Sequence, residues 1–383
     1  MRRKELLGSA LTTITPETRK RELRNSHLAC SGLLLGGLLL LVTWAPSARA
    51  TAAESLRRGS SSTGVLTRVM PKRPGGLALA ANGGLLLVDR QRDQILERLP
   101  DGAFRVFAGD GRVGFSGDGG PAVNAELGQP RAIAVGPDGS VYVADSSNNR
   151  IRRIARNGTI NTVAGNGEVG WTPSGARALA APVEFPDALT FDRSGRLYFT
   201  VGAGEVVRLN TNGTLTKIAG VRGGNAGLYG VGRSATEASV DGANGLAFGR
   251  AGSLYLAGSN TKTLLMIDSS GIMRAPLGTH TSFYPRAPAG LVTAPDGRVV
   301  AIDTQKIVEL GSRGEKTLYS FSHKTFAGVS GFLPEGVAIG RNGLIYVDTY
   351  YGNGWSDGSA ILSLSITQGR VRILWSQPHA RSK

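Results

Sequence analysis

The chain has 383 residues, of which 44 are Lys or Arg and 28 are Asp or Glu, so its formal net charge is +16. The basic residues are spread along the repeats, without a basic arm, a zinc-knuckle spacing or an aromatic RNA-binding motif, which argues against a nucleic-acid-binding protein. Cys30 is the single cysteine, so the fold relies on the apolar core that a chain of this length can bury rather than on disulfides.

The first 50 residues have the features of an export signal. Seven Lys or Arg residues lie among residues 1–27, and an uncharged stretch follows over residues 28–46. Ala48-Arg49-Ala50 then has the small-x-small pattern that signal peptidase cleaves. We therefore expect residues 1–50 to be a signal peptide and the protein to be secreted or extracytoplasmic. The alternative is an uncleaved membrane anchor formed by residues 28–46.

Residues 51–63 read as a flexible linker, and a strand is predicted after it. The linker is rich in Ser and Gly. The strand, residues 65–70, is similar to the last strand of the repeats that follow, but the last repeat has a final strand of its own over residues 371–375. The strand at residues 65–70 is therefore expected either to complete the last repeat or to add a fifth, outer strand to it.

A unit of four short strands recurs from residue 64 to the end. Its clearest copy predicts strands over residues 132–135, 141–144, 150–154 and 159–164, each rich in β-branched or small apolar residues. Asp138-Gly139 and Asn157-Gly158 are turn formers that favour tight antiparallel hairpins. Such a meander cannot bury both of its faces alone, so it requires neighbouring copies.

Two turns and one small residue mark six copies of this unit. The first-hairpin turns are Asn82-Gly83, Asp138-Gly139, Ser194-Gly195, Ala251-Gly252, Asp296-Gly297 and Asn342-Gly343. The later turns are Asp101-Gly102, Asn157-Gly158, Asn212-Gly213, Ser270-Gly271, Arg313-Gly314 and Gln368-Gly369. The small residues that open the first strands are Gly76, Ala132, Ala188, Gly245, Gly290 and Gly336. Four strands per period of 45 to 57 residues predict an all-β fold, a six-bladed β-propeller of four-stranded antiparallel blades over residues 64–383.

The second copy carries a family resemblance. Residues 130–154, PRAIAVGPDGSVYVADSSNNRIRRI, resemble the NHL repeat, and AGDGRVGFSGDGGPA before them resembles a loop of bacterial and teneurin-type NHL propellers. The resemblance covers roughly residues 64 to 375. It implies a six-bladed propeller used mostly as a binding platform, although some relatives of this architecture are enzymes, so the fold alone does not assign the function.

One position in each repeat is expected to line the mouth of the central channel. Strand directions alternate, so the residue before each first strand lies on the same face as the loop between the second and third strands. These positions are Gly75, Arg131, Asp187, Asn244, Ala289 and Glu335. An Arg among two carboxylates favours an ion pair that orients a ligand, and we expect no resident metal or cofactor.

The alternative for the same ring is a metal-dependent enzyme. ANGLAF at Asn244 and PEGVAI at Glu335 are similar to the cation-binding positions of gluconolactonase-like propellers, and strictosidine synthase relatives also place an acid in a late blade. The resemblance implies a calcium-assisted hydrolase that uses Glu335, Asp187 and Asn244. The circular order of these residues differs from that family, and Arg131 adds a positive charge beside the proposed metal.

Aromatic residues are predicted to collect in loops on the same face. These residues are Phe115, Trp171, Tyr229, Phe283, Tyr284, Tyr350, Tyr351 and Trp355. Amphipathic rings commonly anchor ligands, and the long loops after the first three repeats favour a cleft on that side. By contrast, the Asp that ends several second strands, at Asp89, Asp145, Asp303 and Asp348, is interpreted as an acceptor for turn amides.

The sequence therefore favours an exported, non-catalytic binding module. Its predicted ligand-binding residues are Arg131, Asp187, Asn244, Glu335, Trp171, Tyr350, Tyr351 and Trp355. Residues 51–383 keep a net charge of about +11, so anionic envelope polymers are expected partners beside a protein or glycan ligand of the cell envelope.

Overall fold

A computed structural model describes residues 68–69, 71–72, 74–170, 172–202, 204–221, 230–240, 242–258, 263–275, 290–302, 306–311, 314–321, 333–351, 358–365 and 370–376. The predicted export signal and linker, residues 1–63, lie outside these ranges. Val65–Lys383 forms one compact unit. Within the described ranges, none of the helices combines the length and apolarity that crossing a bilayer requires.

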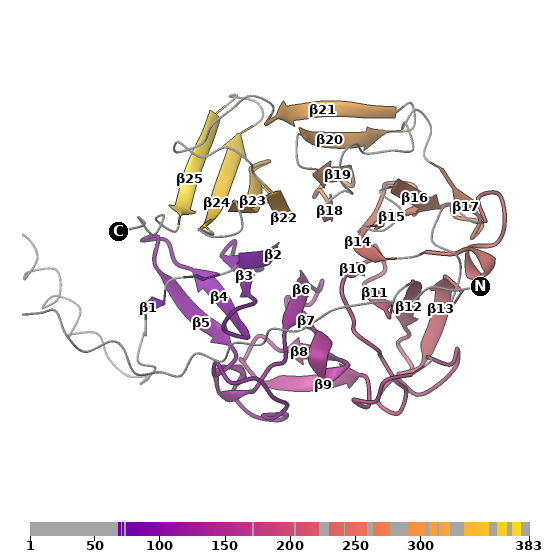
Figure 1. Ribbon diagram of the computed structural model, residues 1–383, viewed down its shortest axis with the longest axis horizontal. Coiled ribbons are helices and arrows are strands. Elements are labelled where there is room, and N and C mark those ends of the chain that lie inside the picture. Colours follow the sequence, from indigo (N-terminus) through magenta and orange to yellow (C-terminus); the bar gives the residue numbers. More distant parts are fainter. Residues whose placement is uncertain are drawn as a thin grey trace, which may run out of the picture. The chain divides into compact units, whose positions relative to one another are not determined.

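The described residues confirm the six-bladed propeller (Figure 1). Its six antiparallel sheets succeed one another along the chain, and each takes its four strands from one continuous segment. The first three blades are β2 to β5 (Pro74–Leu79, Leu85–Asp89, Gln94–Arg98, Phe104–Ala108), β6 to β9 (Pro130–Val135, Val141–Asp145, Arg150–Ile154, Ile160–Ala164) and β10 to β13 (Leu189–Phe191, Leu197–Val201, Glu205–Leu209, Leu215–Ala219). The last three are β14 to β17 (Ala243–Phe248, Leu254–Gly258, Thr263–Ile267, Met273–Arg274), β18 to β21 (Gly290–Thr293, Val299–Ile302, Lys306–Gly311, Gly314–Ser320) and β22 to β25 (Leu333–Ile339, Ile345–Tyr351, Gly358–Ser365, Arg370–Ser376).

The predicted first-hairpin turns lie where the inner strand of each blade reverses into the second strand. All six glycines of the first-hairpin turns have φ between 74° and 83°. A side chain would be strained in this left-handed region, so glycine is the residue that lets each inner strand fold back on the second strand.

The small residues that open the inner strands are explained by close contact between blades. A Cβ atom on Gly76 would lie 3.0 Å from the carbonyl oxygen of Arg131, and one on Gly290 would lie 3.2 Å from Cγ1 of Val337. On Gly336 it would lie 3.0 Å from Cα of Gly76, where the last blade meets the first. The inner strands therefore converge around the channel with room only for small residues.

Each neighbouring pair of blades shares an apolar cluster. Between the first and second blades, for example, Val88 and Ile95 pack with Val143 and Ile154. The ring is closed in the same way, because Leu77 and Leu87 of the first blade pack with Ala338 and Ile361 of the sixth. The propeller is thus held together by side-chain packing between complete blades.

Both expectations for the amino-terminal strand were wrong. β1 (Arg68–Val69) pairs with β5, the outer strand of the first blade, through Val69 opposite Phe104. The connectors into the second, third and fourth blades give the physical reason, because each forms a β-bridge beside the outer strand of the blade that it leads into. These bridges are Pro121 with Thr159, Arg177 with Thr214 and Ser234 with Ile272. Chain entering a blade crosses the outer strand of that blade, and β1 does the same for the first one.

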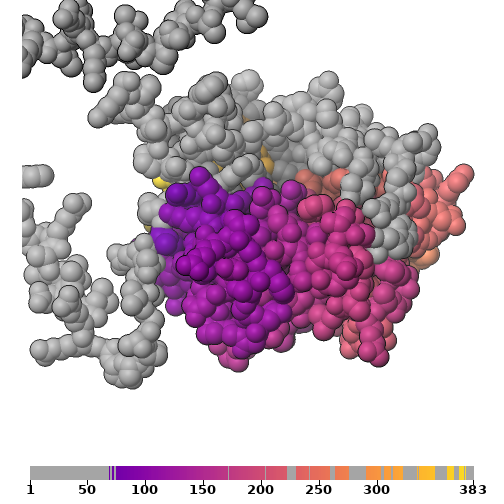
Figure 2. All heavy atoms as spheres, turned by 60° about the horizontal axis from the view of Figure 1, so that its bottom comes forward, coloured from indigo at the N-terminus to yellow at the C-terminus, as the bar shows by residue number. Residues whose placement is uncertain are grey.

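The long connectors into the second, third and fourth blades follow this rule where the structure describes them. The backbone N–H groups of Ala122, Ala178 and Ala235 each donate to a turn carbonyl of the blade being entered, at 2.8 Å. Short 3₁₀ helices, η2 (Ala122–Asn124) and η4 (Ala235–Glu237), form part of these connectors. They cover the exposed edge of the outer strand, which protects it from pairing with other chains. Figure 2 shows the first half of the propeller as a continuous surface from indigo to pink.

Candidate functional site at the channel mouth

The predicted ring positions are turned toward the channel by irregular pairing at the start of the inner strands. The register of β6 against β7 shifts between Pro130 and Ile133, and that of β14 against β15 shifts between Ala243 and Gly245. A β-bulge of this kind re-aims a side chain at the edge of a sheet. Arg131 and Asn244 lie within these two shifts.

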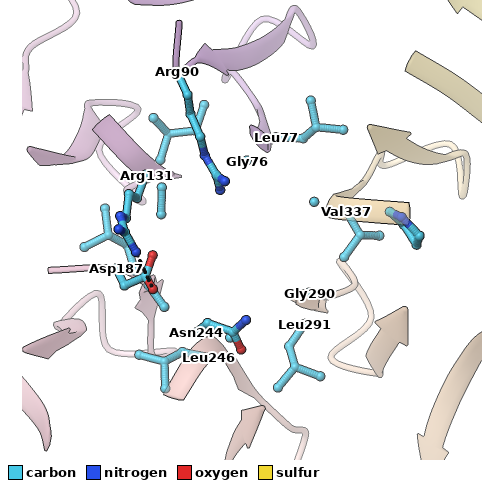
Figure 3. A pocket seen from close by; sticks show the side chains of 17 residues that line it. Gly76, Leu77, Arg90, Arg131, Asp187, Asn244, Leu246, Gly290, Leu291 and Val337 are labelled. Carbon is cyan, nitrogen blue, oxygen red and sulfur yellow. Dashed lines mark hydrogen bonds and ion pairs between the residues drawn. The ribbon is translucent and has the colours of Figure 1, made fainter. Parts of the chain in front are cut away.

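A cavity of about 370 Å³ lies at this place, and its lining comes from the inner strands of all six blades. Most of the lining is small or aliphatic. Among the described side chains, the polar ones in this lining are those of Arg90, Arg131, Asp187 and Asn244, which come from the first four blades and lie along one part of the opening in Figure 3.

Arg131 and Asp187 form the expected ion pair. Nη1 of Arg131 lies 3.4 Å from Oδ2 of Asp187, a single contact rather than a bidentate one. The side chains are 48% and 29% exposed, so the pair contributes only about 0–1 kcal/mol to folding. Asp187 is fixed from behind, because its N–H donates to Oγ1 of Thr200 and Oγ of Ser146 donates to the carbonyl of the preceding Pro186. The pair is therefore held in place and still accessible to a ligand.

Asn244 lines the cavity and has an unsatisfied acceptor. Its Oδ1 atom is buried and has no hydrogen-bond partner within the described part of the chain. A buried polar atom without a partner costs about 1–3 kcal/mol, so a donor from a ligand would be favourable there.

Arg90 was missed by the sequence analysis. It follows β3, and its side chain extends into the opening in Figure 3. A Cβ atom on Gly75 would lie only 2.6 Å from Nε of Arg90, so the first blade has glycine at its ring position and fills the space with this arginine. The signal that could have revealed Arg90 is the combination of a glycine at the first ring position, Gly75, with a basic residue directly after the second strand of the same repeat.

The other predicted site residues lie partly or wholly outside the described residues. The backbone of Glu335 belongs to β22 and those of Tyr350 and Tyr351 belong to β23, but their side chains are not described. Trp171 and Trp355 are outside the described ranges altogether. Within those ranges, no three His, Cys, Asp or Glu side chains come together as a metal cluster.

The comparisons with known proteins agree with this architecture. Residues 110–174 match the family model of the teneurin NHL domain. Human Teneurin-1 is 37% identical over 91 residues, which is 20% of this chain and 3% of that protein. The chain is an NHL-repeat propeller. The matched segment is a small part of a much longer relative, so the similarity concerns the repeat and not the function of the whole relative.

Solved structures resemble the NHL propeller in fold. A streptogramin B lyase superposes with a TM-score of 0.51 at 13% identity, covering 80% of this chain and 84% of that one. A gluconolactonase from Xanthomonas campestris gives a TM-score of 0.49 at 15% identity, covering 74% and 84%. At such identities the likeness to the lyase extends to the fold and not to the chemistry.

The family-matched segment contains a buried ion-pair network that anchors the connector to the second blade. Arg152 is fully buried, and its guanidinium donates to Asp145 at 3.2 Å, to Asp118 at 2.8 Å and to the carbonyl of Ser116 at 2.9 Å. Phe115 lies 3.7 Å below the guanidinium of Arg150, so this aromatic residue packs on the blade. Burial raises the pKa of Asp145, against the opposing effects of Asn148, the Gly128 N–H and Arg152.

The repeated Asp of the NHL propeller is structural where the structure describes its contacts, although its main partners differ from those expected. Asp145 accepts the N–H of Gly128 at 2.7 Å, and Asp89 accepts the N–H of Lys72 at 2.9 Å. Both donors belong to chain that is about to enter the blade. Asp89 also accepts the predicted turn amide, from Gln91 at 3.2 Å. These carboxylates therefore fix the entering chain beside the channel mouth.

Proposed function

We propose that this NHL propeller is an exported, non-catalytic binding module whose channel mouth takes an acidic sugar unit of an envelope or extracellular glycan. One observation carries the proposal: Arg90, Arg131, Asp187 and Asn244, from four blades, converge on a single cavity of about 370 Å³. The basic start, the apolar stretch and Ala48-Arg49-Ala50 support export.

The ligand class follows from the hydrogen-bonding groups of the cavity. Two guanidinium groups provide donors in a fork that suits a carboxylate. Oδ1 of Asn244 and the carboxylate of Asp187 accept hydrogen bonds, which suits hydroxyl groups. A uronic acid combines one carboxylate with several hydroxyls on a small ring, and the positive charge of the chain attracts acidic polymers of such units.

The test compares glucuronate with glucose by calorimetry and by the melting temperature of residues 51–383. Glucuronate at 100 times its dissociation constant stabilises the fold by about 2.7 kcal/mol, and glucose does not. Arg131→Gln lowers the affinity for glucuronate about tenfold, since a charge-assisted hydrogen bond is lost. Arg112→Gln is the matched control, because Arg112 is 80% exposed and contacts Asp110 at only 4.0 Å. Equal binding of both sugars, or equal effects of both substitutions, would refute the acidic-sugar proposal.

A calcium-assisted hydrolase is the second candidate, favoured by the oxygen ligands that Asp187 and Asn244 would offer. The fixed charge of Arg131 at 3.4 Å from Asp187 opposes it. The Arg131→Ala variant, measured in the presence of millimolar calcium, distinguishes the two candidate functions. A binding module loses glucuronate affinity and shows no calcium-dependent melting temperature. A metal site tolerates the substitution and gains a calcium-dependent rise.

A further inference from the structure

Two gaps between blades are filled by a pair of aromatic rings. Tyr142 of β7 meets Phe191 of β10 with ring centroids 5.1 Å apart and an interplanar angle of 71°. Tyr198 of β11 meets Phe248 of β14 at 4.8 Å and 68°. In each case the tyrosine is the second residue of a second strand, and the phenylalanine ends the inner strand of the next blade. Edge-to-face pairs of this kind add to the stability of the interface.

The same pair is incomplete between the fourth and fifth blades, which are neighbours in Figure 1. Tyr255 occupies the tyrosine position in β15, but β18 ends with Thr293 where Phe191 and Phe248 stand in the earlier blades. The registers agree, since Phe191, Phe248 and Thr293 each lie opposite the first residue of the following strand. Oγ1 of Thr293 is hydrogen bonded to the N–H and the carbonyl of Phe248, both at 3.0 Å, and offers no ring to Tyr255.

A cavity of about 670 Å³ opens in this gap. Tyr255, Met266, Val299 and Leu310 are among its lining, together with Gly249. Gly136 and Gly249 follow the inner strands of the second and fourth blades and allow the two gaps to be compared. A Cβ atom on Gly136 would lie 3.1 Å from the ring of Tyr142 and 3.3 Å from that of Phe191. A Cβ atom on Gly249 would lie 2.9 Å from the ring of Tyr255 and would meet no second ring. The volume is in the range of small-molecule pockets.

The rim of this cavity has spare donors and occupied acceptors. Oδ2 of Asp268 accepts from Nε of Arg274 at 2.9 Å, and Oε2 of Glu309 accepts from Arg298 at 2.9 Å. The terminal amino groups of Arg274 have no hydrogen-bond partner among the described residues, and its side chain is 51% exposed. A ligand with an anionic acceptor therefore complements the rim, and an aromatic ring complements the interior.

We propose that the gap between the fourth and fifth blades binds a small aromatic carboxylate. Its ring takes the place that Phe191 and Phe248 occupy in the earlier gaps and packs edge to face against Tyr255. Its carboxylate accepts hydrogen bonds from Arg274. This cavity and the channel mouth have no lining residue in common, so the inference does not depend on the proposed function.

Indole-3-acetate and the uncharged indole are suitable probes, measured by calorimetry on residues 51–383. The wild type binds indole-3-acetate at least tenfold more tightly than indole. Thr293→Phe restores the missing ring and lowers the affinity for both probes at least tenfold, while glucuronate binding is unchanged. Arg274→Gln lowers the affinity for indole-3-acetate about tenfold and leaves that for indole unchanged. Arg196→Gln is the control, because Arg196 forms a comparable Asp pair at 2.6 Å in the third blade.

Several results would overturn the proposal. The wild type binding neither probe would do so, as would Thr293→Phe binding both probes with unchanged affinity. Equal affinity of the wild type for the acid and for indole would remove the role of Arg274. Should Thr293→Phe fail to fold, Thr293→Met places a flexible apolar side chain at the same position, and it is expected to weaken both probes in the same way. Failure of glucuronate to bind would bear only on the channel mouth.

Discussion

The gap between the second and third blades and the gap between the fourth and fifth use the same strand positions with different results. In the former, Tyr142 and Phe191 fill the space between the sheets. In the latter, Thr293 stands at the phenylalanine position, and a cavity of about 670 Å³ lies beside Tyr255. The turns are equivalent in both, so the blade architecture depends on turn glycines while the contents of each gap depend on a few side chains.

The two regions also differ in how they use charge. Arg152 in the second blade is fully buried between Asp145 and Asp118, whereas Arg298 in the fifth blade is 43% exposed and pairs with Asp296 and Glu309. A buried charge that loses its partner is costly, while an exposed pair is screened by solvent. The second blade therefore tolerates less change than the fifth.

The largest expected effect comes from breaking the buried network. Arg152→Met leaves Asp145 buried without its cation and lowers the free energy of unfolding by about 3–5 kcal/mol. Urea denaturation measures this loss. Arg153→Met is the matched control on the adjacent residue: its 38%-exposed side chain pairs with Asp138, and the expected loss is about 0–1 kcal/mol. Equal losses in the two variants would contradict the distinction between buried and exposed pairs.

Converting the filled gap into the open one gives the next largest effect. Phe191→Thr removes the ring that packs on Tyr142, and we expect the free energy of unfolding to fall by about 1–3 kcal/mol. The variant should also gain a second binding site for indole, which calorimetry would detect as a stoichiometry near two. A stoichiometry that stays at one would show that the ring alone does not determine the difference between the gaps.

The smallest expected effect concerns the exposed pairs at the rim of the open gap. The N–H of Arg298, together with its guanidinium, lowers the pKa of Asp296. A carboxylate whose pKa is lowered by folding stabilises the folded protein at every pH above its unfolded pKa, near 3.8. This contribution is lost as the pH falls through the folded pKa. Asp296→Asn should therefore lower stability by less than about 1 kcal/mol at pH 7, and the difference from wild type should disappear once the pH has fallen below the folded pKa of Asp296. A difference that persists there would rule out this origin.

Local patterns predicted the fold, whereas packing between distant segments escaped them. The turn at Asp138-Gly139 follows from backbone geometry that a few consecutive residues determine. The pairing of β1 with β5 could not be predicted in this way, because it depends on where the segment that leads into a blade crosses the outer strand of that blade.

The channel site was predicted in part. Alternating strand directions placed Arg131, Asp187 and Asn244 around one opening, and the structure brings all three to the same cavity. Arg90 reaches the cavity from the end of a second strand, which the ring rule did not include. The cavity beside Tyr255 was also missed, since it appears only when residues about 50 positions apart are compared across blades.

The composition of the blades has a consequence for how the chain assembles. Within the described residues, every blade takes its four main strands from one segment of the chain, and the first and last blades exchange no strand. A blade can therefore acquire its hydrogen bonds as soon as its own segment is free to fold, before the later blades are in place. The final event is then the docking of the sixth blade on Leu77 and Gly76, so late defects in assembly should concentrate at that single seam.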